Sequence, residues 1–247
     1  MTALRTTLII VLLACGTTLR AEDKVDNNSH LWLNYVGQHP LGDGPWGLHL
    51  ETQIRRADFG DEWQQLLIRP GIIYNFSPTL SATLGYAYVK TYPYGDFPAL
   101  DDFPEHRIWQ QLSYTHKLFD LEWQHRFRLE QRFIGQLSPA SGGGYDVADY
   151  RYENRFRYML RTTVPLTSDT KTYLALWNEL FFNFGSNVVG NHFDQNRAFI
   201  GIGHKLTDVT RLEVGFMEQT LQRRGGKIWE HNHTVAVWLT SKWPFGK

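Results

Sequence analysis

Apolar and polar side chains alternate one by one along most of this chain of 247 residues. Residues 121–134 are the clearest case: leucine, tryptophan and phenylalanine recur at one set of alternate positions, while arginine, glutamate and glutamine fill the other. Successive side chains of a β-strand point to opposite faces, so this period predicts strands with one apolar and one charged face. The same alternation recurs at residues 46–56, 63–76, 80–90, 150–164 and 209–220 and, less regularly, at 106–117, 171–184 and 228–242.

The connections between these segments alternate in length. The short ones are residues 77–79, 118–120, 167–170 and 207–208. The long ones, rich in glycine, proline, aspartate and asparagine, are roughly residues 92–104, 135–149 and 185–194. Short turns on one side and long loops on the other are typical of transmembrane β-barrels, whose short turns lie in the periplasm.

A water-soluble β-sandwich is the alternative, because its strands alternate as well. Three features favour the barrel: the strands are long, aromatic residues gather toward segment ends, and the polar face carries too many arginines and glutamates for a dry core. Aromatic residues make up 15% of the chain, although its mean hydropathy is −0.39. Strands with one aromatic and one charged face would produce both values. The sequence thus predicts an all-β, antiparallel transmembrane β-barrel of ten to twelve strands in the cell outer membrane, with short periplasmic turns and longer outer loops.

The number of predicted strands conflicts with a general rule for bacterial barrels. Ten strands are predicted from residue 46 onward, and a weaker alternation at residues 30–38 adds an eleventh. Bacterial single-chain barrels normally have an even number of strands, with both termini in the periplasm. Eleven conflicts with that rule, so either residues 30–38 are an additional segment or a further strand is hidden.

The first 21 residues are typical of an export signal. Arg5 precedes a short apolar run at residues 8–14, and Ala21 provides a small residue at a plausible cleavage site. A run this short does not span a bilayer as a helix. The alternatives are a buried core helix and lipidation at Cys15, because Leu12–Cys15 loosely resembles a lipoprotein cleavage box. We therefore expect a signal peptide at residues 1–21 and one barrel domain at residues 22–247.

Composition excludes several classes of function. Lysine and arginine balance aspartate and glutamate at 25 each, which argues against a nucleic-acid partner. A single cysteine excludes a disulfide framework and any multi-cysteine metal site. His231 and His233 share one strand face and could bind a metal with His125 or Glu230, but two histidines are weak support, and we interpret them as interface residues. We predict no metal and no cofactor.

Several segments resemble a known family. They are residues 105–111 (EHRIWQQ), 126–133 (RFRLEQRF), 155–160 (RFRYML), 178–181 (NELF) and 195–197 (QNR). Together they resemble the outer-membrane β-barrel family catalogued as domain of unknown function 2490, over most of residues 30–240. The resemblance implies a barrel in the outer membrane of a Gram-negative cell. It implies no activity and supplies no catalytic residues.

On the barrel prediction the charged faces point into the lumen, because a charge on the lipid face costs about 2–4 kcal/mol at the bilayer midplane. Long arginine and glutamate side chains could bridge a narrow interior as a polar plug that stabilises a closed barrel. The alternative is a small channel-like pore, in which an arginine-rich wall would favour small anionic solutes. Outer-membrane lipid is the other expected partner, and the oligomeric state is left open. The predicted lumen residues are Glu51, Arg55, Arg69, Arg107, Arg126, Arg128, Glu130, Arg132, Glu153, Arg155, Arg157, Arg161, Glu179, Arg197, Arg211 and Glu213.

An outer-membrane hydrolase that acts on lipid or peptide at the outer loops is the second functional hypothesis. Nucleophilic catalysis requires a nucleophile beside a base that a third group orients. Two groups on the loop side are candidates: His106 with Asp101 and Asp102, and His192 with Asp194. Aspartate-rich loops are commonly solvated turns, so a barrel without enzymatic activity is favoured.

Overall fold

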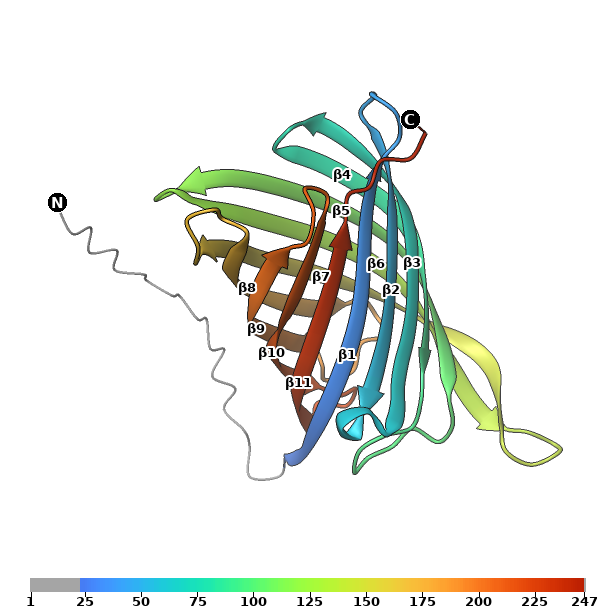
Figure 1. Ribbon diagram of the computed structural model, residues 1–247. Helices are drawn as coiled ribbons and strands as arrows, with labels where there is room; N and C mark the ends of the chain where they lie inside the picture. The colour runs from blue at the N-terminus through green and yellow to red at the C-terminus, as the bar shows by residue number, and fades with distance from the viewer. Residues whose placement is uncertain (1–22, 247) are drawn as a thin grey trace.

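A computed structural model describes residues 23–246, so the predicted signal peptide and Cys15 lie outside the described residues. Within that range eleven β-strands form a closed barrel in which every strand pairs with its neighbours in the sequence (Figure 1). The strands are β1 (Lys24–Pro40), β2 (Trp46–Ala57), β3 (Glu62–Ser77), β4 (Leu80–Thr91), β5 (Phe103–Leu118), β6 (Leu121–Pro139), β7 (Tyr145–Pro165), β8 (Thr172–Phe184), β9 (Phe193–Lys205), β10 (Thr210–Gln222) and β11 (Ile228–Ser241). Residues 23–246 contain no helix long and apolar enough to cross a membrane.

The barrel closes through a parallel pair, β1 and β11, whereas the other ten neighbouring pairs of described strands are antiparallel. The expectation of an even strand number is therefore wrong for the described residues. An odd number requires one parallel seam, and it places the start of β1 and the end of β11 at opposite ends of the barrel (Figure 1). Residues 30–38 belong to the long strand β1, whose alternation is weak because Trp32 and Val36 point inward among polar residues.

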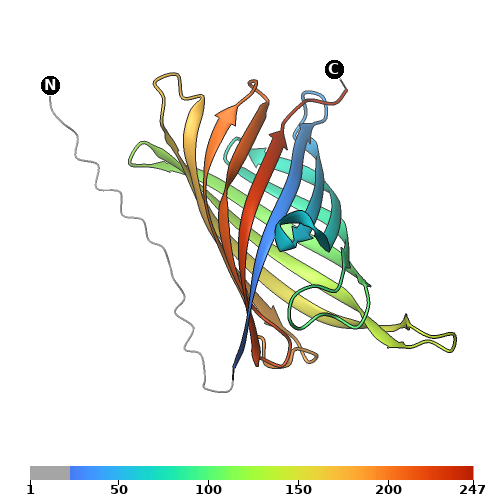
Figure 2. The ribbon, with the colours of Figure 1, turned by 60° about the horizontal axis from the view of Figure 1, so that its bottom comes forward.

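The two ends of the barrel differ in their connections. The end that carries the C-terminus, called here the turn end, holds residues 41–45, 78–79, 119–120, 166–171 and 206–209. The opposite end, the loop end, holds residues 58–61, 92–102, 140–144, 185–192 and 223–227. The long loop expected at residues 135–149 is mostly strand, because β6 and β7 continue into a hairpin that projects beyond the barrel (Figure 2).

The outer face of the barrel is apolar at mid-height and aromatic at both ends. Trp46 and Tyr74 lie edge to face at the turn end with ring centroids 4.8 Å apart, and Trp63 lies 5.4 Å from Tyr92 at the loop end. The exposed side chains between them are mainly aliphatic or phenylalanine, including Leu33, Ile54, Ile68, Ile72, Leu84, Ile108, Phe156, Ile200, Ile202, Val214, Phe216 and Val235. Phe127 on β6 and Phe182 on β8 complete the set, so all eleven strands carry exposed apolar side chains, which is unusual for a soluble monomer.

The inner face is not uniformly polar. One side of it holds the cluster we call the apolar half, made of Trp32, Tyr173, Ala175, Phe199, Met217 and Ala236. Glycines make room for inward rings: a Cβ on Gly85 would lie 2.6 Å from Trp109, and one on Gly201 would lie 2.6 Å from Phe199. Without a Cβ at these two positions, the inward rings can pack directly against the backbone of the neighbouring strands.

Candidate functional site

The inward charges meet halfway along the barrel. All sixteen charged residues that the sequence assigns to the lumen lie on the inner side, and fifteen of them line two internal cavities. The sixteenth, Glu130, is fully buried between these cavities. Inward and outward positions alternate along β6 and β7 up to the register shift at Gln136/Leu137, so the side chains of Arg128, Glu130 and Arg157 reach the same interior.

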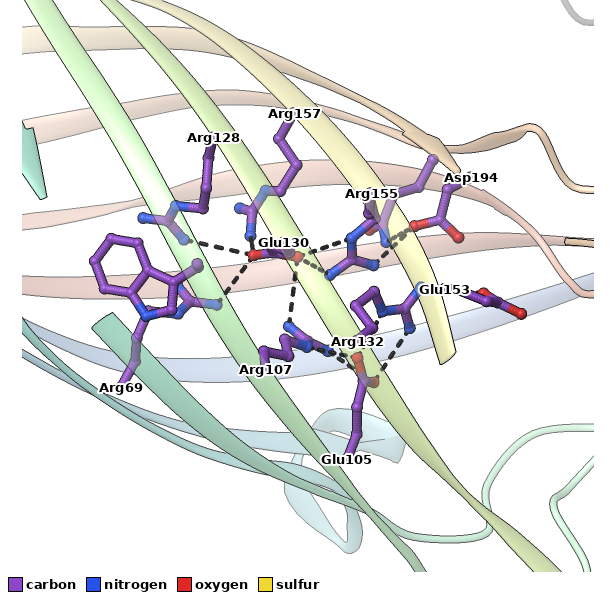
Figure 3. A network of polar contacts seen from close by, with 12 residues as sticks. Arg69, Glu105, Arg107, Arg128, Glu130, Arg132, Glu153, Arg155, Arg157 and Asp194 are labelled. Carbon is purple, nitrogen blue, oxygen red and sulfur yellow. Dashed lines mark hydrogen bonds and ion pairs between the residues drawn. The ribbon is translucent and has the colours of Figure 1, made fainter. Parts of the chain in front are cut away.

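Glu130 is the centre of this layer (Figure 3). One of its oxygens accepts from Arg155 at 2.5 Å, and the other accepts from Arg157 at 2.7 Å. Three further guanidinium groups lie within 4.0 Å of the carboxylate, those of Arg69, Arg107 and Arg128. We call these six residues the Glu130 cluster. Burying a carboxylate at 0% exposure costs free energy, because the charge loses its water. Attraction to five neighbouring guanidinium groups offsets that desolvation cost.

Two more carboxylates join the layer, Glu105 from β5 and Asp194 from β9. Glu105 receives two hydrogen bonds from Arg107, at 2.7 and 2.9 Å, and two from Arg132, at 2.6 and 3.1 Å. Asp194 on β9 accepts from Arg155 at 2.8 Å, so that one arginine links β7 to both β6 and β9. Two-pronged arginine–carboxylate contacts of this kind are among the strongest hydrogen bonds in proteins.

The strand register explains why these carboxylates are needed. Arg128 lies directly opposite Arg157, and Arg107 lies directly opposite Arg132. Like charges at opposed positions destabilise a sheet. Each opposed pair shares a carboxylate, Glu130 in the first case and Glu105 in the second, so the repulsion is offset within the layer.

Two cavities flank the Glu130 cluster. The loop-side cavity has a volume of about 670 Å³, and the turn-side cavity is much smaller at about 120 Å³. Four arginines line both of them: Arg55, Arg69, Arg157 and Arg197. These four arginines therefore lie where the two cavities meet, and we call them the partition.

Aromatic rings support the arginines of the layer. Arg128 lies 4.6 Å from the ring centre of Trp109, and Arg157 lies 4.3 Å from that of Phe181. A guanidinium group over a ring face gains a further attraction when it is desolvated. The sequence prediction of the lumen covered charged residues only, although Trp109 alternates in step with Arg107 and Phe181 with Glu179.

The loop of residues 92–102 folds over the loop-side cavity. The Tyr94 hydroxyl donates to Glu230 at 2.9 Å, although β4 and β11 lie on different sides of the barrel. Arg223 binds both Glu230 and the Phe97 carbonyl oxygen. Burial and the neighbouring Glu230 raise the pKa of Tyr94, so the phenol stays protonated and keeps this hydrogen bond. None of these contacts was predicted from the sequence.

The candidate catalytic groups are not assembled. His106 lies on the outer surface, where its partners are the hydroxyls of Tyr86 at 2.5 Å and Tyr150 at 3.4 Å. Asp102 pairs instead with Lys90 at 2.7 Å.

The second candidate group is divided between inside and outside. His192 is exposed, whereas Asp194 is buried in the charged layer and bound by Arg155. Asp194 is therefore a lumen residue that the sequence had assigned to a loop-side group.

Metal-binding geometry is likewise missing from the part of the chain that the structure describes, where no group of three or more His, Cys, Asp and Glu side chains could hold an ion. His231 and His233 lie on the outer face beside Glu218, at 3.8 and 2.7 Å. Glu230 points to the inside and binds Arg223, so it does not join the histidine pair.

Known proteins resemble this chain to different degrees. It is 27% identical over 232 residues to an uncharacterized protein of Methylorubrum extorquens, and the match covers 92% of each chain. Its fold is similar to a structure of the NanC porin with a TM-score of 0.44 and 13% identity, over 80% of this chain and 91% of that one. The family model described as protein of unknown function (DUF2490) matches residues 29–231. This match confirms the resemblance in the sequence: the chain belongs to the DUF2490 family.

Proposed function

We propose that the protein is an outer-membrane β-barrel whose lumen is closed at mid-depth and admits small anionic solutes to its loop-side cavity. Its short turns would face the periplasm, and its loop end would face the outside of the cell. The observation that carries the proposal is the buried Glu130 cluster, which lies between two separate cavities.

The outer face supports a position in the membrane. An apolar band flanked by aromatic rings at both ends matches what lipid tails and the two bilayer interfaces favour. Closure of the sheet supports it as well, because an open sheet edge would leave backbone groups without partners in lipid.

The inner face supports a preference for anions. The loop-side cavity is lined by ten arginines and four carboxylates, and the turn-side cavity by eight arginines and three glutamates. An excess of fixed positive charge in a confined space attracts anions and excludes cations.

Passage of anions through the barrel is the second candidate function. The four arginines that line both cavities favour it, because a change in their side-chain conformations alone would join the cavities. In that case the protein is a closed channel that opens when the partition rearranges.

Location is tested by membrane fractionation and by heat-modifiable gel migration of the expressed protein. We expect the protein in the outer-membrane fraction, with faster migration when it is not heated. Recovery as a soluble periplasmic protein would contradict the proposal.

Closure is tested by single-channel conductance of the refolded protein in planar bilayers. We expect no steady current from the native protein and anion-selective current steps from the double variant Arg128→Ala/Arg157→Ala. The control is Arg56→Ala, which removes an arginine whose side chain binds the carbonyl oxygens of Gly60 and Asp61 and lies over Trp63. Steady open-pore current from the native protein would overturn the closed-lumen proposal.

A further inference from the structure

Two arginines of the partition stand apart from the others because no carboxylate of the described residues lies within 4.0 Å of them. Within residues 23–246 Arg55 donates only to glutamine oxygens, to Gln53 at 2.5 and 3.0 Å and to Gln65 at 2.5 Å. Arg197 donates to Gln195 at 2.9 Å. Both side chains are buried, at 6% and 8% exposure, so water compensates little of their charge.

The two guanidinium groups lie over the same ring. Arg55 lies 3.9 Å and Arg197 lies 5.0 Å from the ring centre of Trp32, and the Trp32 indole is itself held by Gln64 at 2.8 Å. Two buried cations on one indole repel each other, and neutral amides offset only part of that cost. An anion between them would supply the missing charge and accept from both planar forks.

The cavity that these arginines line has a second, less polar wall. The β4–β5 loop contributes Tyr94, Phe97 and Pro98, and Ile228 of β11 adds to the same wall. The contacts of Tyr94 and Arg223 hold this wall in place. A volume of about 670 Å³ lies within the usual range of small-molecule sites, roughly 300–1,000 Å³.

We propose that Arg55 and Arg197 form the anion-binding floor of a site for a small organic anion that carries a ring or another apolar body. The acidic head would lie between the two guanidinium groups, and the body would pack against the wall formed by residues 94–98. This inference rests on the proposed function, because it names the class of anion that enters the loop-side cavity.

The test is isothermal titration calorimetry of the refolded full barrel with three probes. Benzenesulfonate carries both charge and ring, sulfate carries charge alone, and benzenesulfonamide carries the ring without charge. We expect benzenesulfonate to bind about tenfold more tightly than sulfate, because the ring buries apolar surface. Benzenesulfonamide should bind most weakly of the three.

Variants assign the site. Arg55→Gln and Arg197→Gln should each weaken benzenesulfonate binding by about tenfold or more, because each removes a charged donor. Arg56→Gln is the matched control, since it removes the same charge from the next residue of β2 and should leave binding unchanged. Phe97→Ala should weaken binding of benzenesulfonate and leave that of sulfate unaffected. Heat-modifiable migration shows which variants have folded, and either arginine variant alone suffices for the test.

Two results would overturn the proposal that Arg55 and Arg197 bind the anion. One is equal affinity for benzenesulfonate and benzenesulfonamide, and the other is unchanged affinity in a folded Arg55→Gln or Arg197→Gln barrel. Equal affinity for benzenesulfonate and sulfate would overturn the role of the apolar wall. These outcomes are separable from those of the proposed function. A barrel that passes no current and binds no probe refutes only the site, and one that conducts steadily refutes only the closed lumen.

Discussion

The two halves of the barrel interior fill the same space by opposite means. The apolar half packs Trp32, Phe199 and Met217 over alanines and glycines, at 0–4% exposure. The charged half reaches comparable burial with ion pairs around Glu130, at 0% exposure. Apolar packing loses stability in proportion to the volume removed, whereas a buried ion network depends on each member being paired.

This difference shows where the barrel is vulnerable. In the apolar half the neighbours of a truncated side chain can partly relax into the space. In the charged half the loss of Glu130 would take one counter-charge from five buried arginines at once, and it would leave Arg128 with no carboxylate among the described residues. The charged half therefore gives this narrow barrel a closed interior. We expect substitutions in that half to destabilise the barrel more than substitutions in the apolar half.

Substitution of Glu130 should have the largest effect. Glu130→Gln removes the charge shared by Arg155 and Arg157, and we expect a loss of about 3–5 kcal/mol in the free energy of unfolding. Urea unfolding of the refolded protein in lipid vesicles, followed by tryptophan fluorescence, measures it. Glu122→Gln, at an exposed position of the same strand, is the control and should change stability by less than about 0.5 kcal/mol. Equal losses in the two variants would show that the Glu130 cluster does not hold the charged half together.

Truncation in the apolar half should come next. Met217→Ala removes a fully buried side chain and should cost about 2–5 kcal/mol in the same assay. The control is Val214→Ala, which shortens an outward side chain of the same strand. If Met217→Ala costs more than Glu130→Gln, the relative vulnerability of the two halves is the reverse of our account.

Enlarging a glycine beneath an inward ring should have a smaller effect. A Cβ on Gly85 would lie 2.4 Å from the Pro70 carbonyl oxygen, so Gly85→Ala must shift backbone as well as Trp109 and should cost about 1–3 kcal/mol. Gly44→Ala is the control, because a Cβ there meets no atom within 4 Å. Indistinguishable unfolding curves for the two variants would mean that Trp109 has room to move.

A substitution at the exposed rim of the charged half should change the free energy of unfolding very little. The Arg211 side chain is 38% exposed and lies 3.7 Å from Glu213, so Arg211→Gln should cost no more than about 1 kcal/mol. The effect should shrink further in high salt, which screens exposed pairs. A loss as large as that of Glu130→Gln would extend the strongly coupled layer to the turn end.

The alternation in the sequence predicted the parts of the molecule that depend on local pattern. It located the strands from β2 onward and the inner position of arginines such as Arg128 and Arg157, because side-chain direction along a strand follows from the backbone alone. It did not predict the parallel seam, since pairing of β1 with β11 depends on closure of the whole sheet. The crossing of loop 92–102 to Glu230 was also missed, because it depends on contacts distant in the sequence. The inward position of Trp32 was missed because this apolar residue shares its face with polar His30 and Asn34, which weakens the alternation of β1.

The central claim is that the charged layer separates the lumen into two compartments. It is tested most directly by thiol labelling from one side, in a chain that starts at residue 22 and so contains no native cysteine. Thr91→Cys places a thiol in the loop-side cavity and Ser113→Cys places one in the turn-side cavity. Both are reconstituted in vesicles whose barrel orientation is checked by protease cleavage of the projecting hairpin. A membrane-impermeant thiol reagent added at the loop end should label Thr91→Cys and not Ser113→Cys. Labelling of both at similar rates from that one side would contradict the account.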